Sequence, residues 1–122
     1  MKDEFPAVLI DTFAYEQTSR VPALTRPREN VIVRVATTWC NSAASINDSS
    51  LVNINTAERI TSWGNVSSHL SVWDYTANYD NPTLPYPDYF KWGDNFRFEK
   101  QHKVEGYCES DFLDRDFVCA PR

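Results

Sequence analysis

The run VIVRVATTW, residues 31–39, is mostly apolar and β-branched, which is typical of a strand covered on both faces. Three further runs have the same character: residues 7–16 (AVLIDTFAYE), 70–76 (LSVWDYT) and 104–109 (VEGYCE). Strands separated by connections long enough to hold a helix are typical of parallel sheets, in which a crossover joins each strand to the next. The four runs therefore predict one parallel sheet.

The segment between the second and third of these runs has the pattern of a helix. Ile60 and Trp63 lie three residues apart within NTAERITSWGNVSSH, residues 55–69, which places them on one helical face. Asn55 or Thr56 is the expected N-cap, because short polar side chains accept hydrogen bonds from the first free backbone N–H groups.

The other two connections differ from each other. KWGDNFRFEKQHK, residues 91–103, predicts a short helix capped by Asp94 or Asn95. QTSRVPALTRPREN, residues 17–30, is rich in Pro and Arg and predicts an extended connection. The fold class is therefore α/β, and we interpret it as part of a (β/α)₈ barrel with about four strands present. A small open α/β sheet is the alternative.

The composition excludes several classes of protein. The chain has 122 residues, of which 42% are hydrophobic, enough for one domain with a packed core. The formal charge of -5 and the scattered Lys and Arg predict no nucleic-acid partner. No apolar stretch is long enough to span a membrane, so we expect no membrane partner. The N-terminal sequence MKDEFPAVLID has acidic residues and Pro6 where a signal peptide has basic ones.

The cysteines and glycines argue against a bound metal or cofactor. Cys40, Cys108 and Cys119 lack any C-x-x-C spacing, so we expect no zinc site. We expect small buried thiols, with pairing of two cysteines as the alternative. Three glycines are too few for a phosphate-binding motif, and we expect no cofactor.

Ligands of parallel α/β sheets bind outside the carboxyl ends of the strands, where this chain places several carboxylates. Glu16 follows the first run, Asp74 ends the third and Glu109 ends the fourth. Aromatic rings stack on the apolar faces of sugar rings, while carboxylates and amides bind hydroxyl groups. The pattern predicts a carbohydrate-binding edge with carboxylates suited to glycosidic bond cleavage. The accompanying aromatic and amide candidates are Tyr15, Trp39, Trp73, Tyr75 and Asn78.

Each of these residues also has a purely structural interpretation. A buried carboxylate needs a partner, so Asp74 could cap a turn or pair with Arg34 or Arg97. Glu109 could pair with a lysine. The aromatic residues on either side of Asp74 could pack in the core rather than contact a sugar.

Four segments resemble one protein family in order and spacing: LIDTFAYEQTSRVP (9–22), NVIVRVATTWC (30–40), HLSVWDYTANY (69–79) and DNFRFEKQHKVEGYCES (94–110). The family is the domain of unknown function 4838 family. It overlaps glycoside hydrolase family 163, whose members act as endo-β-N-acetylglucosaminidases on N-glycans. The VWDYTANY and NVIVRV blocks are the most specific parts of the resemblance.

The resemblance implies a (β/α)₈ barrel that is much longer than this chain. Residues 1–112 would be its C-terminal half, residues 113–122 a divergent tail, and the rest of the barrel is expected to be missing. It implies a glycan substrate, and hence an extracellular or secretory-pathway location, although no signal peptide is present in this chain. The chain alone is expected to be inactive.

The resemblance also implies roles for single residues. Glu109 falls on a glutamate that members typically carry at the end of the matching strand, which makes it the first candidate for acid/base or nucleophile. Asp74, in the Trp-Asp-Tyr block, is the second carboxylate or a substrate ligand, and Tyr15 falls on the aromatic residue after the first strand. Many relatives have glutamate where this chain has Trp39. The alternative function is therefore a non-catalytic carbohydrate-binding or degenerate fragment.

Overall fold

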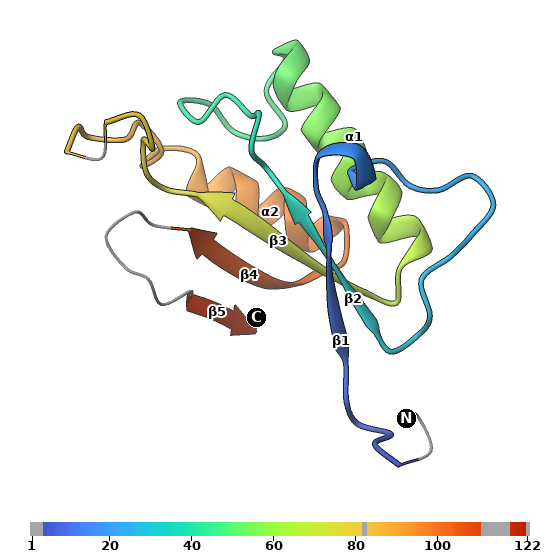
Figure 1. The fold of residues 1–122 in the computed structure, drawn as a ribbon. Helices are drawn as coiled ribbons and strands as arrows, with labels where there is room; N and C mark the ends of the chain where they lie inside the picture. The colour runs from blue at the N-terminus through green and yellow to red at the C-terminus, as the bar shows by residue number, and fades with distance from the viewer. Residues whose placement is uncertain (1–3, 82, 111–117, 122) are drawn as a thin grey trace.

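The structure is a computed structural model that describes residues 4–81, 83–110 and 118–121. Strands alternate with helices along most of the chain, as the hydrophobic patterns predict (Figure 1). The elements are β1 (Ile10–Ala14), the 3₁₀ helix η1 (Glu16–Thr18), β2 (Val31–Ala36), α1 (Leu51–Val66), β3 (His69–Tyr75), α2 (Trp92–Gln101), β4 (Val104–Ser110) and β5 (Val118–Pro121).

All five strands form one sheet, in the order β1-β2-β3-β4-β5. The first four strands pair in parallel, which confirms the α/β class and the parallel sheet. β5 was not predicted; it pairs antiparallel with β4 and covers the edge of that strand. The order and parallel pairing of β1 to β4 are consistent with part of a (β/α)₈ barrel.

The first strand and the first connection are shaped by local turns. β1 is shorter than the predicted run 7–16, because the Val8 N–H donates to the Phe5 carbonyl and forms a turn before the strand. Between β1 and β2 the described chain contains only η1 and no α-helix, which confirms the prediction of an extended connection. This crossover is the unusual one in the sheet, since the next two both contain an α-helix.

Helix α1 starts earlier than predicted, because its N-cap is Ser50, five residues before Asn55 and six before Thr56. The first turn of α1 could not be predicted from buried apolar residues, because its leucine, Leu51, is 79% exposed. Its buried residue is polar instead: the Asn53 amide accepts a hydrogen bond from one loop residue and donates to another. A polar side chain in that position cannot be read as a core residue from hydrophobic periodicity.

Helix α2 also begins earlier than predicted, with Lys91 rather than Asp94 or Asn95 at its N-cap. Asn95 is buried and its Oδ1 accepts a hydrogen bond from the Ile46 N–H at 2.7 Å. Its amide therefore fastens α2 to the loop after β2 rather than capping the helix.

Both helices lie on one face of the sheet (Figure 1). Strand side chains alternate between the two faces, so Val33, Val35 and Val72 point toward the helices together with Tyr107. These residues pack in one buried cluster, and Ile60 and Trp63 of α1 belong to it as well. The helix-covered face therefore holds the main core.

The opposite face is lined by a smaller cluster of Ala36, Trp73 and Cys108. Phe13 of β1 packs edge-on against Trp73, with ring centroids 5.2 Å apart, and the Arg34 guanidinium lies 5.6 Å from both ring centroids. Arg34 also pairs with Asp11, so its charge is compensated on this face.

Cys108 is disulfide-bonded, which corrects the expectation that it is a buried thiol. Its backbone partner across the β4–β5 pair is Cys119. Cys40 is the free cysteine among the described residues and is half-buried. No helix in the described part of the chain has the length and apolar character needed to cross a membrane.

Gly64 of α1 lies close to the backbone of the turn between α2 and β4, and this contact provides a test of the packing. A Cβ added at Gly64 of α1 would lie 2.5 Å from the backbone oxygen of His102, so Gly64→Ala is expected to lower the free energy of unfolding by about 1–3 kcal/mol. A Cβ at Gly93 of α2 meets only the Arg97 side chain, at 3.8 Å. Gly93→Ala is the matched control and should be neutral or stabilising, by up to about 1 kcal/mol. Urea unfolding compares the two; equal effects would contradict the close packing at Gly64.

Candidate functional site

The carboxyl ends of the four parallel strands meet at one edge of the sheet, and Asp74 and Glu109 lie directly opposite each other there. Residues paired in register share a face, so both side chains project from the helix-covered face, as Val72 and Tyr107 do. Trp73 alternates to the other face. The two carboxylates predicted from the sequence are thus brought together at the carboxyl edge.

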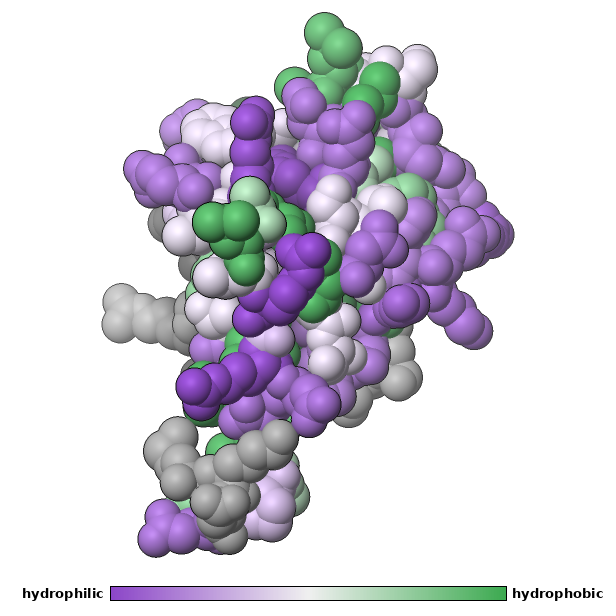
Figure 2. All heavy atoms as spheres, turned by 90° about the vertical axis from the view of Figure 1, so that its right-hand side faces the viewer, coloured by the Kyte–Doolittle hydropathy of each residue, from purple (hydrophilic) through white to green (hydrophobic). Residues whose placement is uncertain are grey.

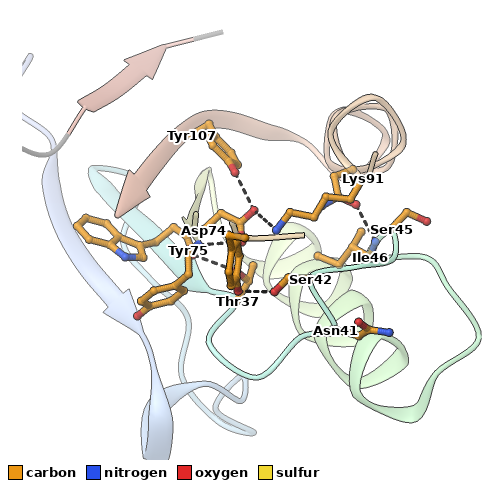
Figure 3. A network of polar contacts seen from close by, with 12 residues as sticks. Thr37, Asn41, Ser42, Ser45, Ile46, Asp74, Tyr75, Lys91 and Tyr107 are labelled. Atoms are coloured by element: carbon orange, nitrogen blue, oxygen red, sulfur yellow. Dashed lines mark hydrogen bonds and ion pairs between the residues drawn. The ribbon is translucent and has the colours of Figure 1, made fainter. Parts of the chain in front are cut away.

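Asp74 is buried, with 2% of its surface exposed, and both carboxylate oxygens have partners. The Tyr75 N–H donates to Oδ1 at 2.9 Å, and the Thr37 hydroxyl donates to the same oxygen. The Tyr107 hydroxyl donates to Oδ2 at 2.8 Å, and Lys91 Nζ forms an ion pair with Oδ2 at 3.0 Å. Thr37, Lys91 and Tyr107 converge on the carboxylate from three directions (Figure 3).

Neither of the partners proposed for Asp74 from the sequence is used. Arg34 pairs with Asp11 on the opposite face, and Arg97 pairs with Asp94 on the surface of α2. The partner is Lys91, which immediately precedes α2 and whose side chain is 1% exposed. The helix start carries this lysine into the space beside β3, so a cation meets the carboxylate inside the protein.

The charges of this pair shape the proton affinities around it. Burial lowers the pKa of Lys91, but the charge and hydrogen bond of Asp74, together with Cys40 and Tyr86, more than offset this change, so the pKa lies above its ordinary value. Burial, and then the Asp74 charge, raise the pKa of Tyr107 well above its ordinary value. The same two causes, in the same order, raise the pKa of the Cys40 thiol. The lysine is therefore held charged, while the tyrosine and the thiol are held neutral.

The loops that follow β2 and β3 are joined above this cluster. Ser42 and Tyr86 are hydrogen-bonded through their hydroxyl groups, which ties the two loops together. Asn53 of α1 holds the first loop from below, accepting from the Asn41 N–H at 2.7 Å and donating to the Ser45 carbonyl at 2.8 Å. The loops around the carboxyl edge are thus fastened to both helices.

Glu109 lines an open cavity of about 550 Å³ beside α2. The side chain is half-buried, and the lining includes a second carboxylate, Asp88, which is itself buried. Burial raises the pKa of Asp88, although the charge of Lys91 opposes this change. The rest of the lining is mostly aromatic: Thr76, Tyr89, Trp92 and Phe96.

Trp39 does not reach this cavity. It is 66% exposed and lines a separate cavity of about 700 Å³ between α1 and the first connection. Because Trp39 follows β2 and the first connection follows β1, this cavity lies at the β1–β2 end of the same carboxyl edge. Its other lining residues are Ser19, Arg20, Val21, Val52, Asn55, Glu58, Arg59 and Ser62.

The remaining aromatic and amide candidates are spread along the edge. Trp73 is 9% exposed and packs against Phe13, as its structural interpretation predicts. Tyr75 packs edge-on against Tyr79, with ring centroids 5.8 Å apart. Neither ring lines the cavity of Glu109.

The other two candidates lie in turns. Tyr15 is 40% exposed and immediately precedes η1. Asn78 accepts hydrogen bonds from the Asp80 and Asn81 N–H groups through its Oδ1, which forms a local turn. Among the described residues, no group of three or more His, Cys, Asp or Glu side chains is arranged to hold a metal ion.

Four residues of the site were not identified from the sequence: Thr37, Asp88, Lys91 and Tyr107. A lysine before a short helix resembles any solvated charge, and Asp88 stands in a proline-rich loop with no periodic pattern. Tyr107 had a usable signal, because it stands two residues before Glu109 in the predicted strand 104–109 and so shares a face with it.

The buried ion pair predicts a large difference between two aspartates. Asp74→Ala would leave the Lys91 charge buried without its partner, which is expected to cost about 3–5 kcal/mol of unfolding free energy. The control is Asp94→Ala, which breaks the exposed pair with Arg97 and should cost less than about 1 kcal/mol. The double variant Asp74→Leu with Lys91→Met should recover part of the loss. Urea unfolding tests all three, and similar costs for the two single variants would contradict the role of the pair.

The raised pKa of Tyr107 predicts how stability changes at alkaline pH. The unfolded chain releases this proton near its ordinary pKa of about 10 while the folded protein retains it, so unfolding free energy should fall as pH rises above about 10. Tyr107→Phe removes this contribution, and the decline should become shallower by about 1.4 kcal/mol per pH unit. Lys91 and Cys40 contribute in the same direction and remain. Tyr89→Phe, at an exposed ring, should keep the wild-type slope in urea unfolding measured across this range.

The comparisons with known proteins agree with the sequence resemblance. The family model described as Domain of unknown function (DUF4838) matches residues 1–117. No curated protein and no solved structure matches the chain. With nearly its whole length covered by this model, the chain belongs to the DUF4838 family.

Proposed function

We propose that the chain forms part of a glycoside-hydrolase-like barrel that acts on the glycosidic bonds of complex glycans. The observation that carries this proposal is the cavity of Glu109, where two carboxylates and three aromatic rings line one open space at the carboxyl edge. Rings of this kind suit the apolar faces of sugars, and paired carboxylates are the groups that glycosidic hydrolysis requires.

Glu109 and Asp88 are the pair that shares this cavity. In hydrolysis one carboxylic acid protonates the leaving glycosidic oxygen, while the other attacks the anomeric carbon or activates water. The raised pKa of Asp88 suits a proton donor, and the half-buried Glu109 suits the second function. Asp74 fits a positioning role better than substrate contact, since its carboxylate is buried among Thr37, Lys91 and Tyr107.

The exposed first edge of the sheet supports the barrel. β1 pairs only with β2 among the described strands, and its apolar residues Ile10 and Phe13 are 41% and 47% exposed. A barrel is closed by pairing such edges, and further strands beside β1 would cover these side chains. On this proposal residues 1–112 supply one half of the barrel and residues 113–122 lie outside its repeating pattern.

A non-catalytic carbohydrate-binding domain is the second candidate, and two observations favour it. Asp74 and Glu109 project from the helix-covered face, which is the outer face of a closed barrel, and β5 covers the edge of β4 that the next parallel strand would use. An open sheet with this cavity would bind a glycan without cleaving it. Trp39, in place of the glutamate of many relatives, agrees with this alternative.

Replacing Glu109 separates the two candidates. In a complete hydrolase that carries this segment, Glu109→Gln should lower release of oligosaccharide from an N-glycopeptide by about 100-fold or more, because the ionisable carboxyl is lost while its shape is kept. The control is Glu105→Gln, at the opposite end of β4, where the glutamate pairs with His69 on the surface. Mass spectrometry measures the products. Unchanged turnover in Glu109→Gln would remove this residue from the reaction, and glycan binding without turnover in a complete wild-type protein that carries this segment would favour the binding domain.

A further inference from the structure

The cavity beside Trp39 is lined by two arginines that have no acidic partner. Among the residues that the structure describes, neither Arg20 nor Arg59 forms an ion pair, whereas Arg34 and Arg97 each contact an aspartate. The protein has 17 acidic and 12 basic residues, so partners are plentiful. Two guanidinium groups that form no ion pair within the described residues therefore mark this cavity as a place suited to an anionic ligand.

Arg59 is held in a fixed orientation by neutral oxygens. Its Nε donates to the Asn55 carbonyl at 3.3 Å and its Nη2 donates to the Thr56 hydroxyl at 2.8 Å. A guanidinium has five N–H donors, so these two bonds leave capacity for a carboxylate. Burial lowers the pKa of Arg59, against a smaller opposing effect of Cys40, because the guanidinium has lost part of its contact with water.

The walls of the cavity are also fixed. The Trp63 indole N–H donates to the Ser19 carbonyl at 2.8 Å, which fastens the first connection to α1. Trp39, at 66% exposure, presents an aromatic surface large enough to cover the apolar face of a sugar ring. Figure 2 shows that the side of the molecule containing α1 is largely hydrophilic, which suits a polar ligand.

We propose that this cavity binds an acidic sugar residue, with Arg20 and Arg59 contacting its carboxylate and Trp39 stacking on its ring. Glu58 also lines the cavity and can accept a hydrogen bond from a sugar hydroxyl. Its negative charge reduces the net positive charge of the cavity, which favours a single carboxylate over a phosphate carrying more charge. The inference rests on the proposed function, because it specifies the class of glycan bound along the same carboxyl edge.

The test compares an acidic glycan with its neutral counterpart on the full chain. Isothermal titration with 3′-sialyllactose and with lactose should show tighter binding of the sialylated sugar. Arg59→Gln should weaken binding of 3′-sialyllactose about tenfold or more while leaving lactose unchanged. Arg97→Gln is the matched control, because this arginine lies on α2 outside the cavity, and it should behave as the wild type. Circular dichroism verifies that each variant is folded.

Three results would overturn the inference: equal binding of the two sugars, wild-type binding by Arg59→Gln, or inorganic phosphate binding as tightly as 3′-sialyllactose. The proposed function is tested independently through Glu109, in the other cavity. Glu109→Gln should keep the preference for 3′-sialyllactose over lactose even where it abolishes turnover. If Glu109→Gln loses turnover and still binds 3′-sialyllactose more tightly than lactose, the result supports both the proposed function and the inference. If turnover depends on Glu109 but the two sugars bind equally, only the inference is contradicted.

Discussion

The buried ion pair between Asp74 and Lys91 is the interaction on which the carboxyl edge depends. It joins the end of β3 to the start of α2, two elements otherwise connected by a long loop. Removing two charges from water is costly, and the cost is met only when both groups have partners. The hydroxyls of Thr37, after β2, and Tyr107, in β4, also donate to the carboxylate, as does the Tyr75 N–H. One carboxylate thus holds together the end of β2, the end of β3, strand β4 and the start of α2.

This cluster also divides the edge into two regions. The cavity of Glu109 lies over β3, β4 and α2, while the cavity of Trp39 lies over α1 and the first connection. Asp74, Thr37 and Lys91 are buried at the same carboxyl edge and line neither cavity. A glycan lying along the edge would therefore meet an acidic, aromatic surface at one end and a basic one at the other. The rigid centre sets the relative position of the two.

Hydrophobic patterns were enough to identify the parallel sheet and both helices, because apolar residues such as Val33, Val72 and Ile60 mark the buried faces of these elements. The starts of the helices were harder to predict, because Asn53 and Asn95 are buried by hydrogen bonds that only the folded loops provide. Carboxylates could be placed at strand ends, but their partners come from residues distant in sequence. The burial of Lys91 could not be predicted, because nothing in the sequence on either side of it distinguishes a buried lysine from a solvated one.

The order of strands in the sheet is the same as their order in the chain, from β1 to β5. Each strand therefore pairs with the one made immediately before it, and no strand waits for a later segment to be inserted beside it. Loop closure between successive strands is the main entropic cost of building such a sheet. Building the sheet in chain order therefore closes only the connection between two successive strands at each step, and the Asp74–Lys91 contact requires the chain up to the start of α2.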